Sequence, residues 1–264
     1  MIGLFFVIFL AFLSIALVVH ELNHGVVMKK RGIIVPEAGL GFKIFNLPYL
    51  KIRVSPEFTF CIHPFLLGAY VRPANGEDIN RLPYSAKTHI YGAGVIANLI
   101  MGAILLGLYV ILAMIEKDTI TSRAVIILTV SVGSSLLLWI GSRIFCSYIF
   151  PFLGFLILGQ LAWSVMKTGL GESVMGPIGI IQSGLNISTF PEAVFWGANI
   201  SIGLALINLL PIVPLDGGHI FLAAMEKIFG NKGAIRTIVT TVGIIAFSLL
   251  IMAVMYSDIL RLLS

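Results

Sequence analysis

Long apolar stretches alternate with short polar segments along this sequence. A helix needs about twenty apolar residues to cross the hydrocarbon core of a bilayer. Windows of that length recur six times, at residues 3–27, 90–115, 123–141, 144–165, 191–212 and 234–257. The pattern predicts an all-α polytopic membrane protein with about six transmembrane helices. Hydrophobic residues make up 58% of the chain and charged residues 11%, which excludes an ordinary soluble domain.

The first apolar stretch could be read as a signal peptide, because residues 1–19 carry no charge. It lacks a basic segment at its start and a small-residue cleavage site at its end, which signal peptides have. We therefore expect this stretch to remain in the protein as a transmembrane helix.

Basic residues gather between the spans and set the expected orientation. Nine of the seventeen fall in or beside the loop after the first span, residues 28–89, and such loops are cytoplasmic. Alternating crossings place four more on the same side, namely Arg143, Lys227, Lys232 and Arg236, and leave Lys117, Arg123, Lys167 and Arg261 opposite. Both termini are then expected outside. Because topology explains the net charge of +5, we expect no nucleic-acid partner.

The loop at 28–89 contains short β-rich runs at 49–54, 58–62 and 66–72, separated by Pro and Gly. Its apolarity favours a membrane-associated β-hairpin loop on the cytoplasmic side. Backbone of this kind is tolerated at membrane depth only beside protein or a wet cavity. No stretch is long and polar enough to be a separate soluble domain, so we expect one membrane-embedded domain over 1–264. Cys61 and Cys146 show no metal or disulfide spacing, which favours reduced thiols.

The candidate chemistry begins with His20, Glu21 and His24, which spell H-E-x-x-H at the end of the first apolar run. On a helix the two histidines project from one face and can hold one zinc ion, while the glutamate can deprotonate a water at the metal. A chance match is the alternative, since short motifs have false positives. Ionisable residues inside a membrane are costly, which favours a functional site.

A third ligand is expected from another span. Asp216 follows a stretch broken by Pro211 and Pro214, and crossing parity puts it at the same membrane depth as the two histidines. His219 is the competing ligand, with a supporting or packing role as its other interpretation. For His63 and His89, in or beside the β-rich loop, we expect solvated or structural roles.

These motifs resemble the site-2 protease family of intramembrane zinc metalloproteases. The resemblance is carried by six motifs, namely His20-Glu21-x-x-His24, "GLGF" at 39–42, "GAYV" at 68–71, "GVIAN" at 94–98, "GPIGI" at 176–180 and Asn208-x-x-Pro211-x-x-Pro214-Leu-Asp216-Gly-Gly. The most similar branch is the bacterial regulator-of-sigma-E protease group. That group also has both termini outside and a membrane-associated β-hairpin loop.

The resemblance implies roles for particular residues. His20, His24 and Asp216 would bind one Zn²⁺ ion, and Glu21 would be the catalytic base. Asn208 matches an asparagine implicated in holding the substrate backbone, and a hydrogen bond between helices is its other interpretation. Gly68, Tyr70 and Val71 in the "GAYV" motif would present a β edge to an unwound substrate.

This chain also departs from the family pattern. Asn23 stands where the family usually has Gly, Val95 where it has Pro, and Ala69 where it has Gly. Residues 123–165 form two apolar spans at the place where the branch carries external PDZ domains. Two extra crossings preserve parity, so the core can still assemble, but substrate selection must differ.

The sequence thus predicts an intramembrane zinc endopeptidase of the bacterial cytoplasmic membrane, with its active site toward the cytoplasm. Its partners would be the lipid bilayer and single-span proteins or remnant signal peptides, cleaved within or near their transmembrane segments. The alternative is a non-catalytic metal-binding membrane protein or transporter of the same fold. A purely structural zinc would not need Glu21, and Gln160 and Asn199 are few polar groups for a transport path.

Overall fold

The computed structural model describes residues 2–42, 47–116, 141–142, 145–168, 176–230 and 233–263. Its long helices are α1 (Ile2–Lys30), α3 (Tyr84–Glu116), α6 (Phe150–Thr168), α9 (Phe190–Asn208) and α11 (Gly233–Leu263). Shorter ones are α2 (Glu77–Asn80), α8 (Pro177–Leu185) and α10 (Asp216–Phe229), and a π-helical turn, η1 (Phe145–Ile149), leads into α6. Within these ranges, five helices are long and apolar enough to cross a membrane. The polytopic helical fold is confirmed, and nearly all of the span expected at 123–141 lies outside the described residues.

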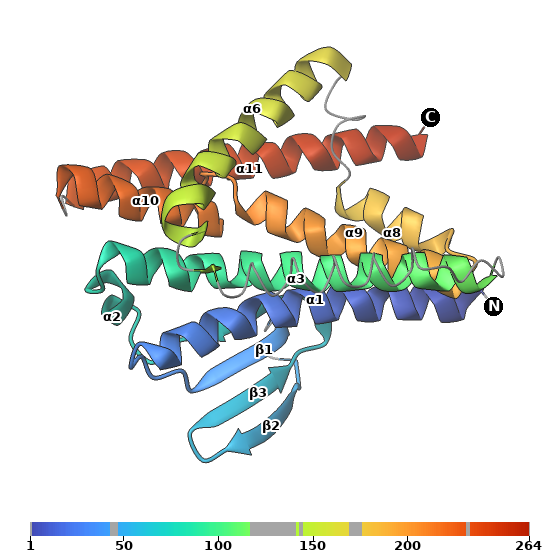
Figure 1. Ribbon diagram of the computed structural model, residues 1–264, viewed down its shortest axis with the longest axis horizontal. Helices are drawn as coiled ribbons and strands as arrows, with labels where there is room; N and C mark the ends of the chain where they lie inside the picture. The colour runs from blue at the N-terminus through green and yellow to red at the C-terminus, as the bar shows by residue number, and fades with distance from the viewer. Residues whose placement is uncertain are drawn as a thin grey trace.

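The membrane helices are arranged around α1, α3 and α9, which pack against one another. Figure 1 shows the two chain termini at the same end of the molecule, and α1 and α9 run in the same direction away from that end. The sequence predicted this shared direction for the two spans that carry or precede the candidate ligands. The polar end of α1 therefore lies near the end of α9.

The fifth span is shorter than expected, because α9 ends at Asn208 instead of continuing to 212. Pro211 and Pro214 lack backbone N–H donors, so the helical hydrogen-bond ladder cannot pass through this stretch. The chain restarts as α10 at Asp216, a separate helix that the sequence reading did not foresee. The break thus delivers Asp216 to the first turn of a new helix.

The loop after α1 folds into a four-stranded sheet, not a single hairpin. Its strands are β1 (Glu37–Phe42), β2 (Leu50–Ser55), β3 (Phe58–Ile62) and β4 (Phe65–Arg72), in the order β2-β3-β1-β4. Three strands match the expected β-rich runs, whereas β1 was not expected. It pairs parallel with β3 and antiparallel with β4. This order leaves β4 as an edge strand, and that strand packs against α1.

Two glycines let β1 and β4 interlock. A side chain at Gly39 would have its Cβ 2.7 Å from the Tyr70 ring, so that ring lies across the strand at this position. In the opposite direction, the ring of Phe42 occupies the space where a Cβ of Gly68 would stand, and Gly68 has a φ of +104°, which favours glycine. These contacts explain the glycines of the "GLGF" and "GAYV" motifs structurally.

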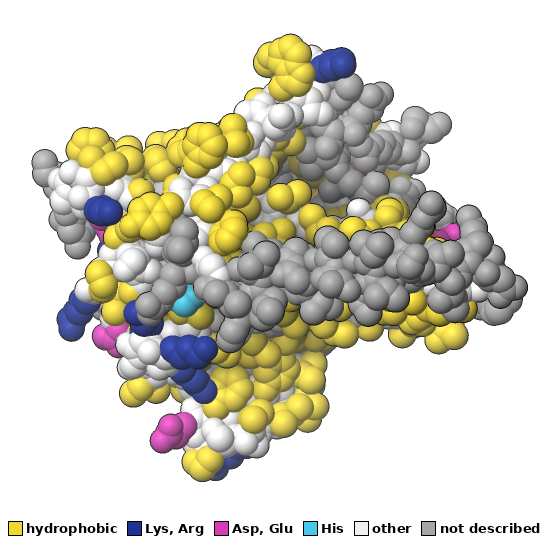
Figure 2. Space-filling view, in the orientation of Figure 1, with side chains coloured by type: hydrophobic (Ala, Val, Ile, Leu, Met, Phe, Trp, Pro, Cys, Tyr) yellow, Lys and Arg dark blue, Asp and Glu magenta, His cyan; other side chains and the backbone are white. Residues whose placement is uncertain are grey.

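Apolar side chains cover much of the outer surface, as Figure 2 shows for one face. On α6 and α11 they include Phe152, Trp163, Leu249 and Met252, each more than 60% exposed. A soluble protein rarely exposes apolar patches of this extent, whereas lipid tails are a favourable partner for them. The surface therefore supports the bilayer as the environment of these helices.

One buried carboxylate joins the C-terminal helix to the Gly-Pro motif. Asp258 of α11 accepts hydrogen bonds from the backbone N–H groups of Gly176, Ile178 and Gly179, at 3.2, 3.0 and 3.0 Å. These donors belong to the first turn of α8, which has no partners for them within the helix. Asp258 is 2% exposed and so acts as an interhelical cap for α8.

We predict that Asp258→Ala destabilises the protein by about 3 kcal/mol, because buried hydrogen bonds to a charged acceptor are lost and backbone donors are left unpaired. Thermal unfolding in detergent, followed by circular dichroism, measures the change. Asp78→Ala on α2 removes a carboxylate whose side-chain bond to Asn75 is exposed, and it should leave the transition unchanged. Equal melting of both variants would contradict the capping role.

Candidate metal centre

The H-E-x-x-H motif lies in the last third of α1, where both histidines are buried. His20 and His24 are each 5% exposed, and their rings meet edge to face with centroids 4.8 Å apart. One ligand atom from each of these residues and one from Glu21 all lie within 4.8 Å of one another. The helix thus aims two imidazoles and one carboxylate at a common point.

Asp216 reaches the same point from the first turn of α10. Its Oδ2 atom lies 2.9 Å from Nε2 of His20 and 3.2 Å from Nε2 of His24, although the residues are 196 and 192 positions apart in sequence. Ligands at zinc–nitrogen and zinc–oxygen distances on a tetrahedron are separated by about 3.3 Å. The two distances from Asp216 to the imidazole nitrogens are therefore close to the spacing between ligands in a tetrahedral zinc site.

The charge of Asp216 is also fixed by its surroundings. Burial alone would raise the pKa of this carboxyl group, but the two imidazoles beside it hold the pKa well below its usual range. The carboxylate is the form of this side chain that binds a cation.

Glycines bring the surrounding backbone close to this cluster. A Cβ at Gly94 of α3 would lie 2.6 Å from Nε2 of both His20 and His24, so only glycine leaves the metal-facing nitrogens free. Gly217 and Gly218 follow Asp216 and pack on the backbone of Leu209 and Val213 in the helix break. Close packing on both sides confines the three donors to one small volume.

Helix α3 also orients the two imidazoles through their other ring nitrogens. Nδ1 of His24 donates to the backbone carbonyl of Ile90 at 2.7 Å, which leaves Nε2 free to bind a metal. Nδ1 of His20 lies 3.2 Å from the side-chain amide of Asn98. For Nε2 of His20 to bind a metal, Nδ1 must carry the proton and needs an acceptor.

Asn98 has that acceptor. Its Oδ1 atom is buried and has no hydrogen-bond partner among the described residues. In the opposite orientation of the amide, Oδ1 would stand next to His20 and would accept its Nδ1 proton. The donor set and its oriented imidazoles therefore fit a zinc ion, which His20, His24 and Asp216 would hold.

Strand β4 lies directly beside Glu21. The backbone N–H of Val71 faces the Glu21 carboxylate, and the Val71 side chain packs over Gly25 one turn further along α1. Because β4 is at the edge of the sheet, its outer backbone groups border the cluster. Val71, the last residue of the "GAYV" motif, therefore adjoins the cluster.

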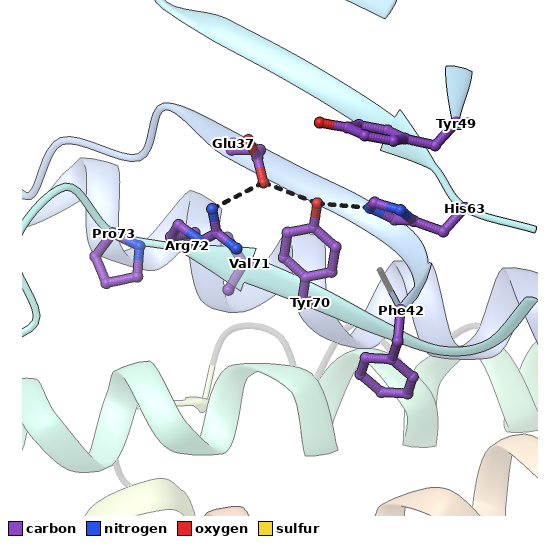
Figure 3. Close-up of a pocket in the computed structure, with 8 residues that line it drawn as sticks. All are labelled: Glu37, Phe42, Tyr49, His63, Tyr70, Val71, Arg72 and Pro73. Atoms are coloured by element: carbon purple, nitrogen blue, oxygen red, sulfur yellow. Dashed lines mark hydrogen bonds and ion pairs between the residues drawn. The ribbon is translucent and has the colours of Figure 1, made fainter. Parts of the chain in front are cut away.

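The Tyr70 side chain points to the other face of the sheet, into a cavity of about 520 Å³ (Figure 3). Its hydroxyl donates to Glu37 at 2.8 Å and lies 3.2 Å from Nε2 of His63, and Arg72 pairs with Glu37 at 3.3 Å. Burial and the bond to Glu37 raise the pKa of Tyr70 above its usual range, so the phenol stays protonated. The network ties β4 to β1 and to the turn that follows β3.

The remaining candidates lie outside the cluster. His219 stacks on Tyr91 with ring centroids 4.7 Å apart, and burial lowers the pKa of this histidine. His89 lies 3.5 Å from Arg31, which gives it a contact far from the ligands. The Asn208 amide donates to Leu204 of its own helix at 3.0 Å, not to another helix. Asn23 makes the same kind of bond to Val19.

A family profile described as peptidase family M50 matches residues 8–252. The chain belongs to this family. The match includes every candidate ligand and the broken helix between α9 and α10. It confirms the resemblance to the site-2 proteases that the motifs carried.

Several relatives named as zinc metalloproteases align with the chain. A protein of Nostoc sp. is 26% identical over 317 aligned positions, which cover 84% of this chain and 86% of the relative. One from Lactococcus lactis is 38% identical over 120 residues, or 41% of this chain and 28% of the relative. The zinc metalloprotease RasP of Shouchella clausii is 34% identical over 127 residues, or 44% and 27%. The chain thus spans about a quarter of the length of several of these relatives.

In this M50 peptidase we predict that Gly94→Ala weakens zinc binding at least about tenfold, because the added methyl group meets both metal-facing nitrogens. Zinc retained by the purified protein during competition with a chelator measures the effect. Gly203→Ala on α9 adds the same methyl group where nothing lies within 4 Å, and it should retain zinc normally. Normal zinc retention in both variants would contradict the proposed position of the metal.

We further predict that Asn98→Leu lowers zinc affinity by about 10- to 100-fold, the usual effect of removing a group that orients a ligating histidine. The same chelator competition provides the measurement. Asn199→Leu is the matched control, since this exposed asparagine donates to the backbone carbonyl of Phe195 in its own helix. Unchanged affinity in Asn98→Leu would show that the amide does not orient His20.

Proposed function

We propose that this protein is an intramembrane zinc endopeptidase in which His20, His24 and Asp216 hold one Zn²⁺ ion. The observation that carries the proposal is the contact of one Asp216 oxygen with both histidines, at 2.9 and 3.2 Å. Membership of family M50 and the names of the relatives support zinc as the metal. Bound there, zinc would acidify a water and polarise a peptide carbonyl.

Glu21 supplies the proton transfers. Its carboxylate adjoins the two histidines without being one of the three donors that Asp216 brings together. In peptide hydrolysis it takes a proton from the attacking water and passes it to the leaving amine. A site with a merely structural metal would have no use for this group.

The edge strand β4 is suited to present a substrate. A transmembrane substrate must unwind before cleavage, because its carbonyl groups are bonded within the helix. An extended segment added beside β4 would replace those bonds and run past Val71, next to Glu21. Gly68 and Tyr70 support this role indirectly, by shaping the strand, and Asn208 lies at the end of α9 where a substrate backbone could pass.

We infer that the substrates are single-span membrane proteins or remnant signal peptides, cut within or near the membrane-spanning part. The basic residues after α1 favour a cytoplasmic position for the ends of α1 and α9, so cleavage would occur near the cytoplasmic face with both termini outside. The five apolar helices and the bacterial relatives support the bacterial cytoplasmic membrane as the location.

We predict that Glu21→Gln lowers cleavage of a co-expressed single-span substrate at least about 100-fold, because general acid-base catalysis is lost. Immunoblotting of precursor and product measures cleavage, and metal analysis of the purified variant should show zinc retained. Glu57→Gln, on the exposed turn between β2 and β3, is the matched control and should cleave normally. Zinc retention with undiminished cleavage in Glu21→Gln would refute the mechanism and favour a non-catalytic metal-binding protein.

A further inference from the structure

A second cavity, of about 580 Å³, lies apart from the metal centre at the other end of α10. The ends of several elements form it, and its polar and aromatic lining includes Arg31, Tyr84, Ser85, Ser147, Tyr148 and Lys227. The lining joins the C-terminal end of α1, the start of α3, the turn η1 and the last turn of α10. Elements far apart in the chain therefore converge on one polar pocket.

The charged side chains that line this pocket are all basic. Its lining contains two cations, Arg31 and Lys227, and no carboxylate. Lys227 places its ammonium group 4.7 Å from the centre of the Tyr84 ring, and Arg31 lies 3.5 Å from a nitrogen of His89. Within the described parts of the chain, neither cation pairs with an acidic side chain. The pocket therefore has the electrostatics of an anion site.

Two other basic residues near the pocket, unlike Arg31 and Lys227, are paired with a carboxylate in the described part of the chain. Lys87 pairs with Glu226 at 2.7 Å, and Arg236 approaches the same glutamate at 3.8 Å. Glu226 is the residue immediately before Lys227, but it does not line the pocket, and its ion pairs among the described residues are with Lys87 and Arg236. Hydroxyl groups of Ser85 and Tyr148 add neutral donors to the pocket.

Three candidate membrane spans begin or end at this pocket. By length and composition, the span of α1 ends at Lys30, that of α3 begins at Tyr84, and the span formed by η1 and α6 begins at Phe145. With these helices across a bilayer, the pocket would lie at the level of the phospholipid phosphates. In Figure 2 several basic side chains lie toward this end of the visible face, where α2 and the ends of α1 and α10 are found in Figure 1.

A row of exposed aromatic side chains, called the aromatic track below, runs from the pocket through η1 and along α6. Tyr148, Phe152 and Phe155 recur at helical spacing and are 73, 65 and 50% exposed. A phosphate seated between Arg31 and Lys227 would place its attached acyl chains against these rings. A soluble phosphate compound would make no use of that track.

We propose that this pocket binds the phosphoryl group of an anionic phospholipid headgroup. The two cations and the hydroxyl groups contact the phosphate oxygens, and the aromatic track on α6 accommodates the acyl chains. Bound lipid links α10 to α1 and α3. The site is separate from the metal centre, so it does not depend on the proposed peptidase activity.

Native mass spectrometry of the full-length protein, released from nanodiscs, tests the proposal with phosphatidylglycerol as the probe and phosphatidylcholine as the neutral reference. In the double variant Arg31→Gln/Lys227→Gln, phosphatidylglycerol affinity should fall about thirtyfold, since each basic residue at an anionic surface contributes about a factor of five. The matched control Lys30→Gln/Lys51→Gln removes the same charge from exposed positions outside the lining. It should retain lipid as the unaltered protein does.

Four further outcomes decide the proposal. An equal loss of phosphatidylglycerol affinity in both double variants would overturn the proposal, because the affinity would then depend on general surface charge. Unchanged affinity in both variants would also overturn it, because the two pocket cations would then make no contribution. Arg31→Lys/Lys227→Arg should restore binding, and zinc content and thermal unfolding show that each variant is folded. Competition by glycerol phosphate as strong as by the lipid would overturn the lipid assignment in favour of a soluble phosphate.

Discussion

The contact between the Asp216 carboxylate and the His20 and His24 imidazoles is the constraint on which the rest of the structure depends. All three side chains are nearly closed to solvent in a protein whose surroundings are largely hydrocarbon. Burying such groups singly would cost several kcal/mol each, whereas converging on one cation compensates them together. The free-energy cost of burying these polar groups therefore favours a fold in which the end of α1 meets the start of α10.

The contact between Asp216 and the two histidines requires both a break after α9 and close packing of the backbone. Had α9 continued through Pro211, Asp216 would have travelled past the level of the histidines instead of turning toward them. Gly94 removes the side chain that would otherwise separate α3 from the imidazoles, and Gly217 allows α10 to start against the carbonyl of Leu209. Small residues permit such approaches between membrane helices generally. Here they set the size of the metal site.

The sequence could predict that three side chains meet but not the groups that orient them. The H-E-x-x-H spacing and crossing parity were enough to predict the cluster of His20, His24 and Asp216 that the structure contains, and their roles as metal ligands stay a proposal. Asn98 was visible only as the last residue of "GVIAN", because its role depends on which face of α3 packs against α1. The Ile90 carbonyl has no side-chain signal at all. Strand β1 was missed for a similar reason, since its pairing with β3 joins residues that are not neighbours in sequence.

Helix α10 connects the two sites that the fold creates. Asp216 is its first residue and Lys227 lies near its end, about 17 Å away at the rise of an α-helix. Between them the buried pair of Lys87 and Glu226 fastens the helix to α3. Helix α10 therefore carries a residue of the metal centre in its first turn and a residue of the polar pocket in its last turn, and its contact with α3 fixes both residues relative to the same membrane helix.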